Sequence, residues 1–162
     1  MRPATLAKTA TGALATALIG GLASRPAQSA WYENLRKPGF QPPRQAFPIV
    51  WPLLYADIAV VSASTVDQLD ERGSTAEART YSALLALNLV LNASWSWLFF
   101  NRRLLGTSAV AAAALTASSA DLTRRSVSVR GAAAAPLALY PLWCAFATVL
   151  ASSIWWLNRS SD

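Results

Sequence analysis

A succession of apolar segments, each about as long as a membrane-spanning helix, constrains this chain more than any other feature. A helix needs roughly 20 largely apolar residues to cross the hydrocarbon core of a bilayer. The segments cover about residues 4–23, 47–66, 81–100, 104–122 and 132–157. They leave no room for a separate water-soluble domain. We therefore predict a single domain over residues 1–162, an all-α integral membrane protein built as a five-transmembrane-helix bundle.

Composition supports lipid as the solvent. The chain is 54% hydrophobic and 14% charged, whereas soluble domains average about 25% charged residues. A closed β-barrel would need strands that alternate polar and apolar residues, but residues 81–100 and 132–157 are apolar at odd and even positions alike. A soluble bundle of buried helices is the other alternative. Tryptophans at the segment ends fit an interfacial aromatic belt better.

The first apolar segment has an alternative reading as a cleaved signal peptide. Arg2 and Lys8 precede an apolar core, and Ala27-Gln28-Ser29-Ala30 resembles a small-residue cleavage site. However, the apolar stretch is close to spanning length and leads directly into Trp31. We predict a retained helix, followed by a Pro-rich loop over residues 24–46 that is too long for a simple turn and is therefore a candidate functional loop.

The net charge of +6 comes from Lys and Arg residues placed between the apolar segments, where they meet lipid headgroups. We therefore predict a lipid bilayer, and no nucleic acid, as a partner. The cations divide evenly between the two ends of the predicted bundle, so the positive-inside rule assigns no orientation. One end carries Arg2, Lys8, Arg72, Arg79, Arg124, Arg125 and Arg130, and the other carries Arg25, Arg36, Lys37, Arg44, Arg102, Arg103 and Arg159.

Residues for enzyme chemistry are scarce. The chain has no His, and its one cysteine, Cys144, lies inside an apolar run, where we interpret it as a buried structural thiol. Paired carboxylates at a useful spacing and a Gly-rich phosphate loop are also missing from the sequence. We predict no catalytic residues and no metal ligands, and we leave enzymatic activity undecided.

Polar and aromatic residues recur at helical spacing in three segments, which places each set on one helix face. The sets are Phe47, Trp51 and Tyr55; Asn88, Asn92 and Ser96, with Trp95 and Phe99 beside them; and Tyr140, Trp143, Ala147, Leu150 and Ile154. An uncharged pocket with Trp, Tyr and one or two amides suits a flat, largely apolar ligand. The alternative is that the amides only bond neighbouring helices and the rings only pack.

Asp57 is the one acidic residue in the middle of a predicted span. An ionisable group at that depth is a candidate for a proton or ion relay. We favour the alternative, a protonated or hydrogen-bonded side chain that faces another helix. Its direction on the helix differs from that of Trp51 and Tyr55, so it need not face the same pocket.

Four motifs follow one another along the chain. Residues 31–43 read W-Y-E-N-L-R-K-P-G-F-Q-P-P, and residues 47–55 read F-P-I-V-W-P-L-L-Y. Residues 86–100 read A-L-N-L-V-L-N-A-S-W-S-W-L-F-F, and residues 143–150 read W-C-A-F-A-T-V-L. In this order they resemble the first loop, the start of the second helix, the third helix and the fifth helix of the translocator protein (tryptophan-rich sensory protein) family in its bacterial form.

The resemblance implies a dimer of five-helix bundles that binds porphyrins and flat drugs in a pocket beneath the first loop. No cofactor is then required, and porphyrin or haem is the expected ligand. Carried over by position, the lid residues are Trp31, Tyr32, Pro42 and Pro43. The pocket residues are Trp51, Tyr55, Asn92, Trp95, Phe99, Trp143, Ala147 and Leu150, and Phe47 and Asn88 join them from the helical spacing.

Departures from the family pattern limit the resemblance. Ala151 and Ser152 replace the polar and aromatic residues expected there, and Trp156 occupies the basic position of the sterol motif, so we do not expect sterol binding. The predicted function is tetrapyrrole binding for transport, sequestration or sensing. The alternatives are a light- and oxygen-dependent enzyme that degrades porphyrin, a regulatory scaffold that acts through a protein partner, and a purely structural bundle.

Overall fold

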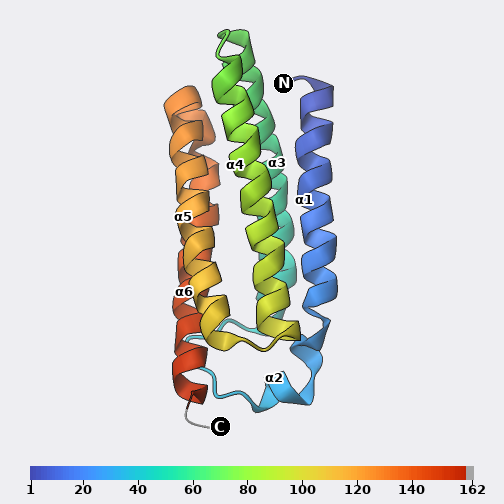
Figure 1. Ribbon diagram of the computed structural model, residues 1–162, viewed down its shortest axis with the longest axis vertical. Coiled ribbons are helices and arrows are strands. Elements are labelled where there is room, and N and C mark those ends of the chain that lie inside the picture. The colour runs from blue at the N-terminus through green and yellow to red at the C-terminus, as the bar shows by residue number, and fades with distance from the viewer. Residues whose placement is uncertain (160–162) are drawn as a thin grey trace.

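The computed structural model describes residues 1–159, and the regular elements in this part of the chain are all helices. The long helices α1 (Pro3–Ala23), α3 (Phe47–Glu71), α4 (Thr75–Ser96), α5 (Leu105–Arg130) and α6 (Leu139–Asn158) lie side by side along the long axis of the molecule (Figure 1). Short elements connect them: η1 (Arg25–Gln28), α2 (Ala30–Asn34), η2 (Arg44–Ala46), η3 (Trp97–Asn101) and η4 (Gly131–Ala138).

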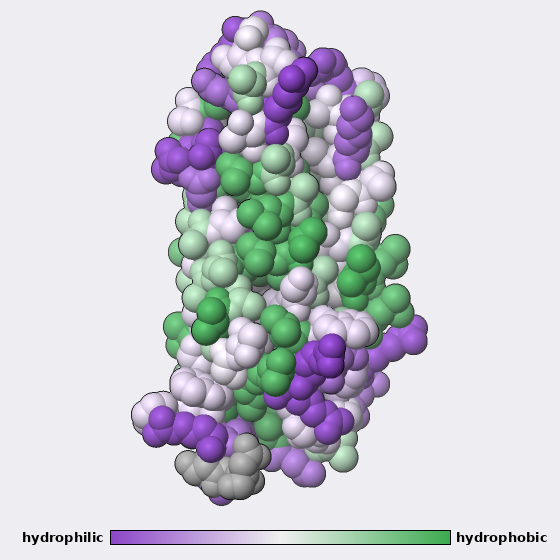
Figure 2. All heavy atoms as spheres, viewed as in Figure 1, coloured by the Kyte–Doolittle hydropathy of each residue, from purple (hydrophilic) through white to green (hydrophobic). Residues whose placement is uncertain are grey.

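The surface of the bundle is apolar between two hydrophilic ends. Figure 2 shows hydrophobic side chains gathered across the middle of one face and hydrophilic ones at both ends. Large apolar side chains are widely exposed, including Leu18 at 69%, Leu53 at 67% and Val110 at 71%. Within residues 1–159, four helical stretches are long and apolar enough to cross a membrane, and the last, Leu105–Asn158, has 54 residues and includes α5, η4 and α6. Lipid is the solvent in which such a surface is stable.

The helices extend past the apolar segments that predicted them. The segment over residues 47–66 becomes α3, which continues to Glu71, and the segment over residues 104–122 becomes α5, which continues to Arg130. Apolar patterning marks the part of a helix that faces lipid. The backbone hydrogen bonds continue for another turn or two, where polar side chains reach the headgroup region.

Proline in the last helical stretch removes one backbone hydrogen bond. Pro141 has no N–H, so the carbonyl of Leu137, four residues earlier, loses its helical donor. The Thr123 hydroxyl on α5 lies 3.2 Å from that carbonyl and shares its hydrogen with the Ser119 carbonyl of its own helix at 2.8 Å. This contact lies where the 3₁₀ turn η4 passes into α6 beside α5.

Helix α1 is attached at both ends. At one end, the Arg2 guanidinium donates from Nε to Asp67 at 2.9 Å and from Nη2 to Asp70 at 2.5 Å, and the Arg2 backbone N–H also donates to Asp67. At the other end, Asn101 Nδ2 donates to the carbonyl of Ala23 at 2.7 Å. The middle of α1 is therefore held against α3 and α4.

Candidate functional site

A cavity of about 890 Å³ lies inside the half of the bundle that ends at α2 and the loop over residues 24–46. Its walls come from α1, α3, α4, η3 and α6, and residues of the loop close its end. In the described part of the chain, α5 contributes no residue to the wall. The cavity is therefore built mainly by four long helices and one loop.

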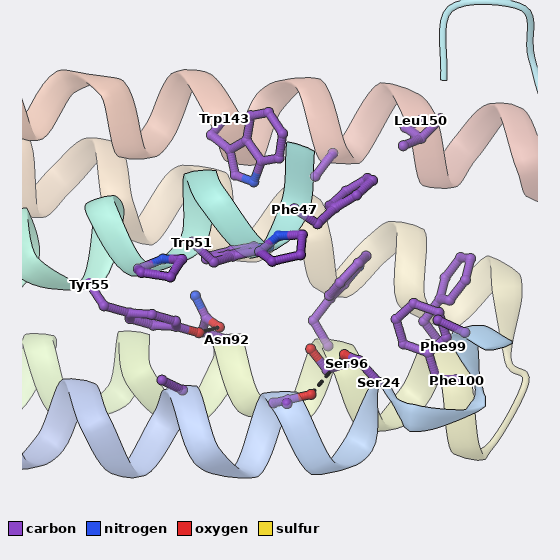
Figure 3. A pocket seen from close by; sticks show the side chains of 18 of the residues that line it. Ser24, Phe47, Trp51, Tyr55, Asn92, Ser96, Phe99, Phe100, Trp143 and Leu150 are labelled. Atoms are coloured by element: carbon purple, nitrogen blue, oxygen red, sulfur yellow. Dashed lines mark hydrogen bonds between the residues drawn. The ribbon is translucent and has the colours of Figure 1, made fainter. Parts of the chain in front are cut away.

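Helix α3 supplies an aromatic wall. Trp51 and Tyr55, one helical turn apart, stack with ring centroids 5.5 Å apart and planes 28° apart. Trp143 of α6 meets Trp51 edge-on at 6.5 Å, and Phe47 meets Trp143 at 5.9 Å. Figure 3 shows these rings projecting from α3 and α6 toward the same space. The arrangement offers both ring faces and ring edges to a flat ligand.

A second aromatic group sits where α4 passes into η3. Trp95 stacks on Phe99 with centroids 5.6 Å apart and planes 26° apart, and Phe100 packs edge-on against Phe99 at 4.8 Å. Residues 97–101 form a π-helical turn. Phe99 and Phe100 of this turn both line the cavity.

Helix α1 forms its part of the wall from small residues. Ala13, Ala17 and Gly20 line the cavity, and Gly20 is buried. A Cβ atom added to Gly20 would lie 3.6 Å from Ser96 Oγ and 3.9 Å from the Tyr55 hydroxyl. Apart from Leu14, the lining residues of α1 are small, and this leaves the volume open.

A chain of hydrogen bonds leads from the cavity into the core. The Tyr55 hydroxyl donates to Asn92 Oδ1 at 2.9 Å, and Asn92 Nδ2 donates to the Tyr140 hydroxyl at 2.9 Å. Tyr140 in turn donates to Asn88 Oδ1 at 2.8 Å, and Asn88 Nδ2 donates to Ser118 Oγ at 3.1 Å. The chain joins α3, α4, α6 and α5. It fixes the direction of the Asn92 amide, because both of its polar atoms are bonded.

The loop over residues 24–46 is held over the cavity end. Tyr32 is buried and packs on Phe100 at 5.6 Å, and its hydroxyl accepts from Gln41 Nε2 at 3.1 Å. Asn158, at the end of α6, accepts from the Arg36 backbone N–H at 3.0 Å and donates to the Arg36 carbonyl at 2.9 Å. This loop, called the lid below, is therefore bonded internally and to α6.

Charged groups at the lid are arranged around its aromatic residues. Arg44 pairs with Glu33 at 3.1 Å and lines the cavity. The Lys37 ammonium lies 4.5 Å from the centre of the Tyr32 ring. Burial lowers the pKa of Lys37, and repulsion by Arg44 lowers it further, against an attraction by Glu33.

Most of the binding residues expected from the sequence meet at this cavity. Its wall includes Tyr32, Phe47, Trp51, Tyr55, Asn92, Trp95, Phe99, Trp143, Ala147 and Leu150. Trp51, Asn92 and Trp143 come from three different helices, and Figure 3 shows them around one space.

Four expected residues do not line the cavity. Trp31 packs on Phe99 at 6.3 Å as part of the lid, and Pro42 and Pro43 lie in the lid between the lining residues Gln41 and Arg44. Asn88 is fully buried and bonds Tyr140 and Ser118. Asn88 and Asn92 lie one turn apart on the same helix face, so the sequence could not show which of the two lines the cavity.

Several lining residues were not expected from the sequence. Phe100, Phe146, Gln41 and the small residues of α1 all line the cavity. Phe100 lies one turn beyond Ser96 on the stripe of Asn88, Asn92 and Ser96, and Phe146 lies one turn before Leu150, but neither was included in the expected site. The small residues of α1 had a detectable repeat, but such a repeat is typical of close helix packing and gives no sign of a cavity.

Asp57 lies apart from the cavity wall. Its side chain is half-buried, and one carboxyl oxygen is buried without a hydrogen-bond partner. Within residues 1–159, the structure shows no group of three or more His, Cys, Asp or Glu side chains that could hold a metal ion.

The fold and the cavity define a multi-pass integral membrane protein with a mostly apolar pocket between its helices. The sequence profile of the TspO/MBR family matches residues 9–157, which is most of the chain. The chain belongs to the TspO/MBR family, and this confirms the resemblance seen in the sequence motifs.

Relatives with known names support the assignment. The translocator protein of Ovis aries is 32% identical over 158 residues, which cover 96% of this chain and 88% of that protein. The translocator protein of Homo sapiens is 31% identical over 125 residues, which cover 77% of this chain and 73% of that protein. The tryptophan-rich sensory protein of Cereibacter sphaeroides is 35% identical over 77 residues, which span 48% of this chain and 44% of that relative's length.

Proposed function

We propose that this chain binds a tetrapyrrole, a porphyrin or haem, inside the cavity, for transport, sequestration or sensing. One observation carries the proposal: the cavity, about 890 Å³, is walled by stacked aromatic pairs on two different helices. Sites for small flat ligands are typically concave, mostly apolar and of roughly 300–1,000 Å³. Trp51 with Tyr55, and Trp95 with Phe99, offer the stacking surfaces.

The positive charges of the lid favour a ligand that carries acidic groups on one edge. Arg44 lines the cavity, and Arg36 and Lys37 lie in the same loop. Their positive charges would attract the propionate groups of a porphyrin. The chain has no His, the common axial ligand of haem iron. Ring stacking and apolar burial would then provide most of the affinity, so metal-free porphyrin should bind about as well as haem.

We also propose how the chain sits in the membrane. Figure 1 shows α5 and α6 side by side, with the chain returning through η4. Two crossings by Leu105–Asn158 would give five crossings in all. Exposed small residues on α5, such as Ala113 and Ala117, suit close approach of a second copy, and a homodimer is the proposed assembly.

Ligand titration tests the function directly. Purified protein in detergent is titrated with protoporphyrin IX, haem and cholesterol while Trp fluorescence is followed. We expect protoporphyrin and haem to bind within about tenfold of each other and cholesterol to bind far more weakly. Haem affinity a hundredfold higher than that of protoporphyrin, roughly 2.7 kcal/mol, would show an iron ligand that this proposal omits.

A matched pair of variants tests the location. Trp51→Ala removes a stacking ring and should weaken protoporphyrin binding by about 1–3 kcal/mol, by analogy with base–aromatic stacking. Trp156→Ala removes an exposed ring outside the cavity and should leave the affinity unchanged. Equal losses in both variants, or none in either, would place the ligand elsewhere.

Names of the relatives, translocator and sensory protein, favour transport or sensing over catalysis. Illumination of the porphyrin complex in air separates these functions from a degrading enzyme. If the protein only binds porphyrin, the porphyrin absorbance should decay under light at the rate seen for free porphyrin. An enzyme would yield a defined product faster than that.

A further inference from the structure

The cavity has exposed residues along one side of its helical wall only. Among the lining residues that the described helices α1, α3, α4, η3 and α6 supply, the exposed ones belong to α1 and α3: Leu14, Gly21, Pro48, Pro52 and Ala56. The lining residues of α4, η3 and α6 are buried or half-buried. A residue that lines a cavity and also lies on the surface of the bundle marks an opening. The cavity therefore opens sideways between α1 and α3.

This opening lies in the apolar part of the bundle. Its five residues carry no polar side-chain atom, and they belong to the stretches Pro3–Gln28 and Arg44–Glu71, which are apolar enough to cross a membrane. Leu18, one turn from Leu14, and Leu53, next to Pro52, are exposed at 69% and 67%. In a bilayer, a surface of this kind faces acyl chains rather than water.

Helix α1 is held in place on both sides of the opening. Toward the end of the bundle opposite the lid, Thr9 Oγ lies 2.8 Å from the carbonyl of Ala59 on α3. At the lid end, Asn101 holds the carbonyl of Ala23. Figure 1 shows α1 at the outer edge of the bundle. The opening is therefore a window between two anchored helices.

Leu14 is the bulkiest side chain that α1 places at the opening. It is 63% exposed, and the other residues of α1 that line the cavity are small: Ala10, Ala13, Ala17, Gly20 and Gly21. A Cβ atom added to Gly21 would meet no other atom within 4 Å. The space beside Gly21 is therefore open, and Leu14 is the side chain of α1 that narrows the window most.

We infer that the opening between α1 and α3, called the portal below, is the route by which a flat apolar ligand passes between the acyl chains and the cavity. Such a ligand collects in the bilayer, because transfer of apolar surface out of water is favourable. It then reaches the portal without crossing the headgroups, and the lid remains the boundary toward water. This inference rests on the proposed binding of a tetrapyrrole in the cavity.

Relaxation kinetics in vesicles measure passage through the portal. The protein is placed in lipid vesicles with protoporphyrin IX, with lipid in large excess so that most of the porphyrin is in the bilayer. A small temperature jump disturbs the binding equilibrium, and Trp fluorescence follows its return. The relaxation rate should rise linearly with the porphyrin-to-lipid ratio. The slope then gives the rate constant for entry from the bilayer, and the intercept gives the rate constant for release.

Variants at the portal should change these rates without changing the affinity. A passage is not part of the bound state, so obstructing it slows entry and release by the same factor. We expect Gly21→Phe to slow both rates by about fivefold or more, and Leu14→Ala to raise both by about threefold. Ala56→Phe narrows the portal from α3 and should act like Gly21→Phe. The matched control is Ala15→Phe, at an exposed position of α1 that does not line the cavity.

The lid variant Asn158→Ala separates the two routes. It loosens the boundary toward water and should leave the rate of entry from the bilayer unchanged. A lower entry rate in the portal variants, together with an unchanged rate in Asn158→Ala and Ala15→Phe, supports the portal. Thermal unfolding of each variant checks that the fold is retained.

The remaining outcomes distinguish the inference from the function on which it rests. If the wild-type chain does not bind protoporphyrin IX, the proposed function fails. If it binds, and Gly21→Phe and Ala56→Phe both leave the entry rate unchanged, the ligand enters elsewhere and the inference is wrong. The inference is also wrong if these variants lower the affinity by faster release alone, because the new rings then compete for the cavity. Equal slowing in Ala15→Phe would contradict it as well.

Discussion

The hydroxyl of Tyr140 accepts a hydrogen bond from the Asn92 amide at 2.9 Å. Tyr140 is fully buried and does not line the cavity, whereas Asn92 does. Tyr140 also donates to Asn88 at 2.8 Å, so one hydroxyl joins two amides of α4 to α6. The orientation of a cavity residue is thus set by a side chain behind the wall.

Replacing Tyr140 with Phe should both destabilise the protein and loosen the site. The substitution leaves the Asn92 amide and the Asn88 carbonyl without their partner, at a cost of about 1–3 kcal/mol. Tyr81→Phe is the matched control, since Tyr81 is equally buried and bonds Ser62 and Ser126 away from the cavity. Both variants should lower the thermal unfolding temperature, and only Tyr140→Phe should weaken porphyrin binding. Similar binding losses in both would mean that the effect is one of general stability.

The bond between Asn158 and the lid predicts a change in release rate. Asn158→Ala removes both hydrogen bonds to the Arg36 backbone, together worth roughly 1 kcal/mol at this exposed position. Stopped-flow fluorescence should show porphyrin leaving about fivefold faster, with little change in the association rate, because a lid governs escape more than encounter. Asn34→Ala, an exposed lid position, should release at the wild-type rate. An unchanged off-rate in Asn158→Ala would show that this contact does not hold the lid.

The space beside Gly20 predicts that a side chain there competes with the ligand. A Cβ atom at this position makes only ordinary contacts, at 3.6 Å with Ser96 Oγ and 3.9 Å with the Tyr55 hydroxyl. Gly20→Leu should therefore be tolerated by the fold and should lower porphyrin affinity by at least about tenfold, since its side chain enters the cavity. Ala15→Leu, on the exposed face of α1, should bind normally. Unfolding temperatures of the two variants show whether any loss comes from misfolding.

Tyr32 predicts a loss of lid closure at alkaline pH. Burial raises the pKa of Tyr32 above its ordinary value of about 10, although the Gln41 hydrogen bond and the Arg44 charge oppose this shift. The closed lid thus favours the neutral phenol. As the pH rises through about 10, Tyr32 ionises more readily when the lid is open, so the closed lid becomes less stable relative to the open lid. The porphyrin off-rate should increase between about pH 9 and pH 11.

Two variants assign that pH dependence. Tyr32→Phe cannot ionise, so its off-rate should stay flat over the same range. Lys37→Met removes a neighbouring ammonium whose lowered pKa acts in the opposite direction, since losing its charge favours the buried position. In this variant the porphyrin off-rate should still increase over the same pH range. A rise that persists in Tyr32→Phe would assign the effect to another group.

Local periodicity explains what the sequence could predict. Residues one turn apart on a helix must share a face, so the stacking of Trp51 on Tyr55 follows from a spacing of four. The motif-based resemblance then identified the family that the comparisons confirm. The cavity-facing positions of α3 and α6 follow from these two sources together.

Contacts between helices explain what the sequence could not predict. Asn88 and Asn92 have the same spacing pattern, but α5 places Ser118 against Asn88 alone. The depth at which α5 crosses α4 decides which amide is structural, and no local pattern encodes that depth. Likewise, the π-helical turn η3 at the end of α4 could not be predicted, because such turns leave little trace in an apolar run.

The tryptophans are divided between the interior and the periphery, and this makes the protein its own optical reporter. Trp51, Trp95 and Trp143 line the cavity, whereas Trp97, Trp155 and Trp156 are exposed at 52%, 41% and 58%. A bound porphyrin would quench the inner group most strongly, since those rings lie closest to it. Lipids with brominated chains would quench exposed rings that contact the acyl region. Combining the two quenchers in one vesicle experiment would read cavity occupancy and membrane contact separately, without any attached dye.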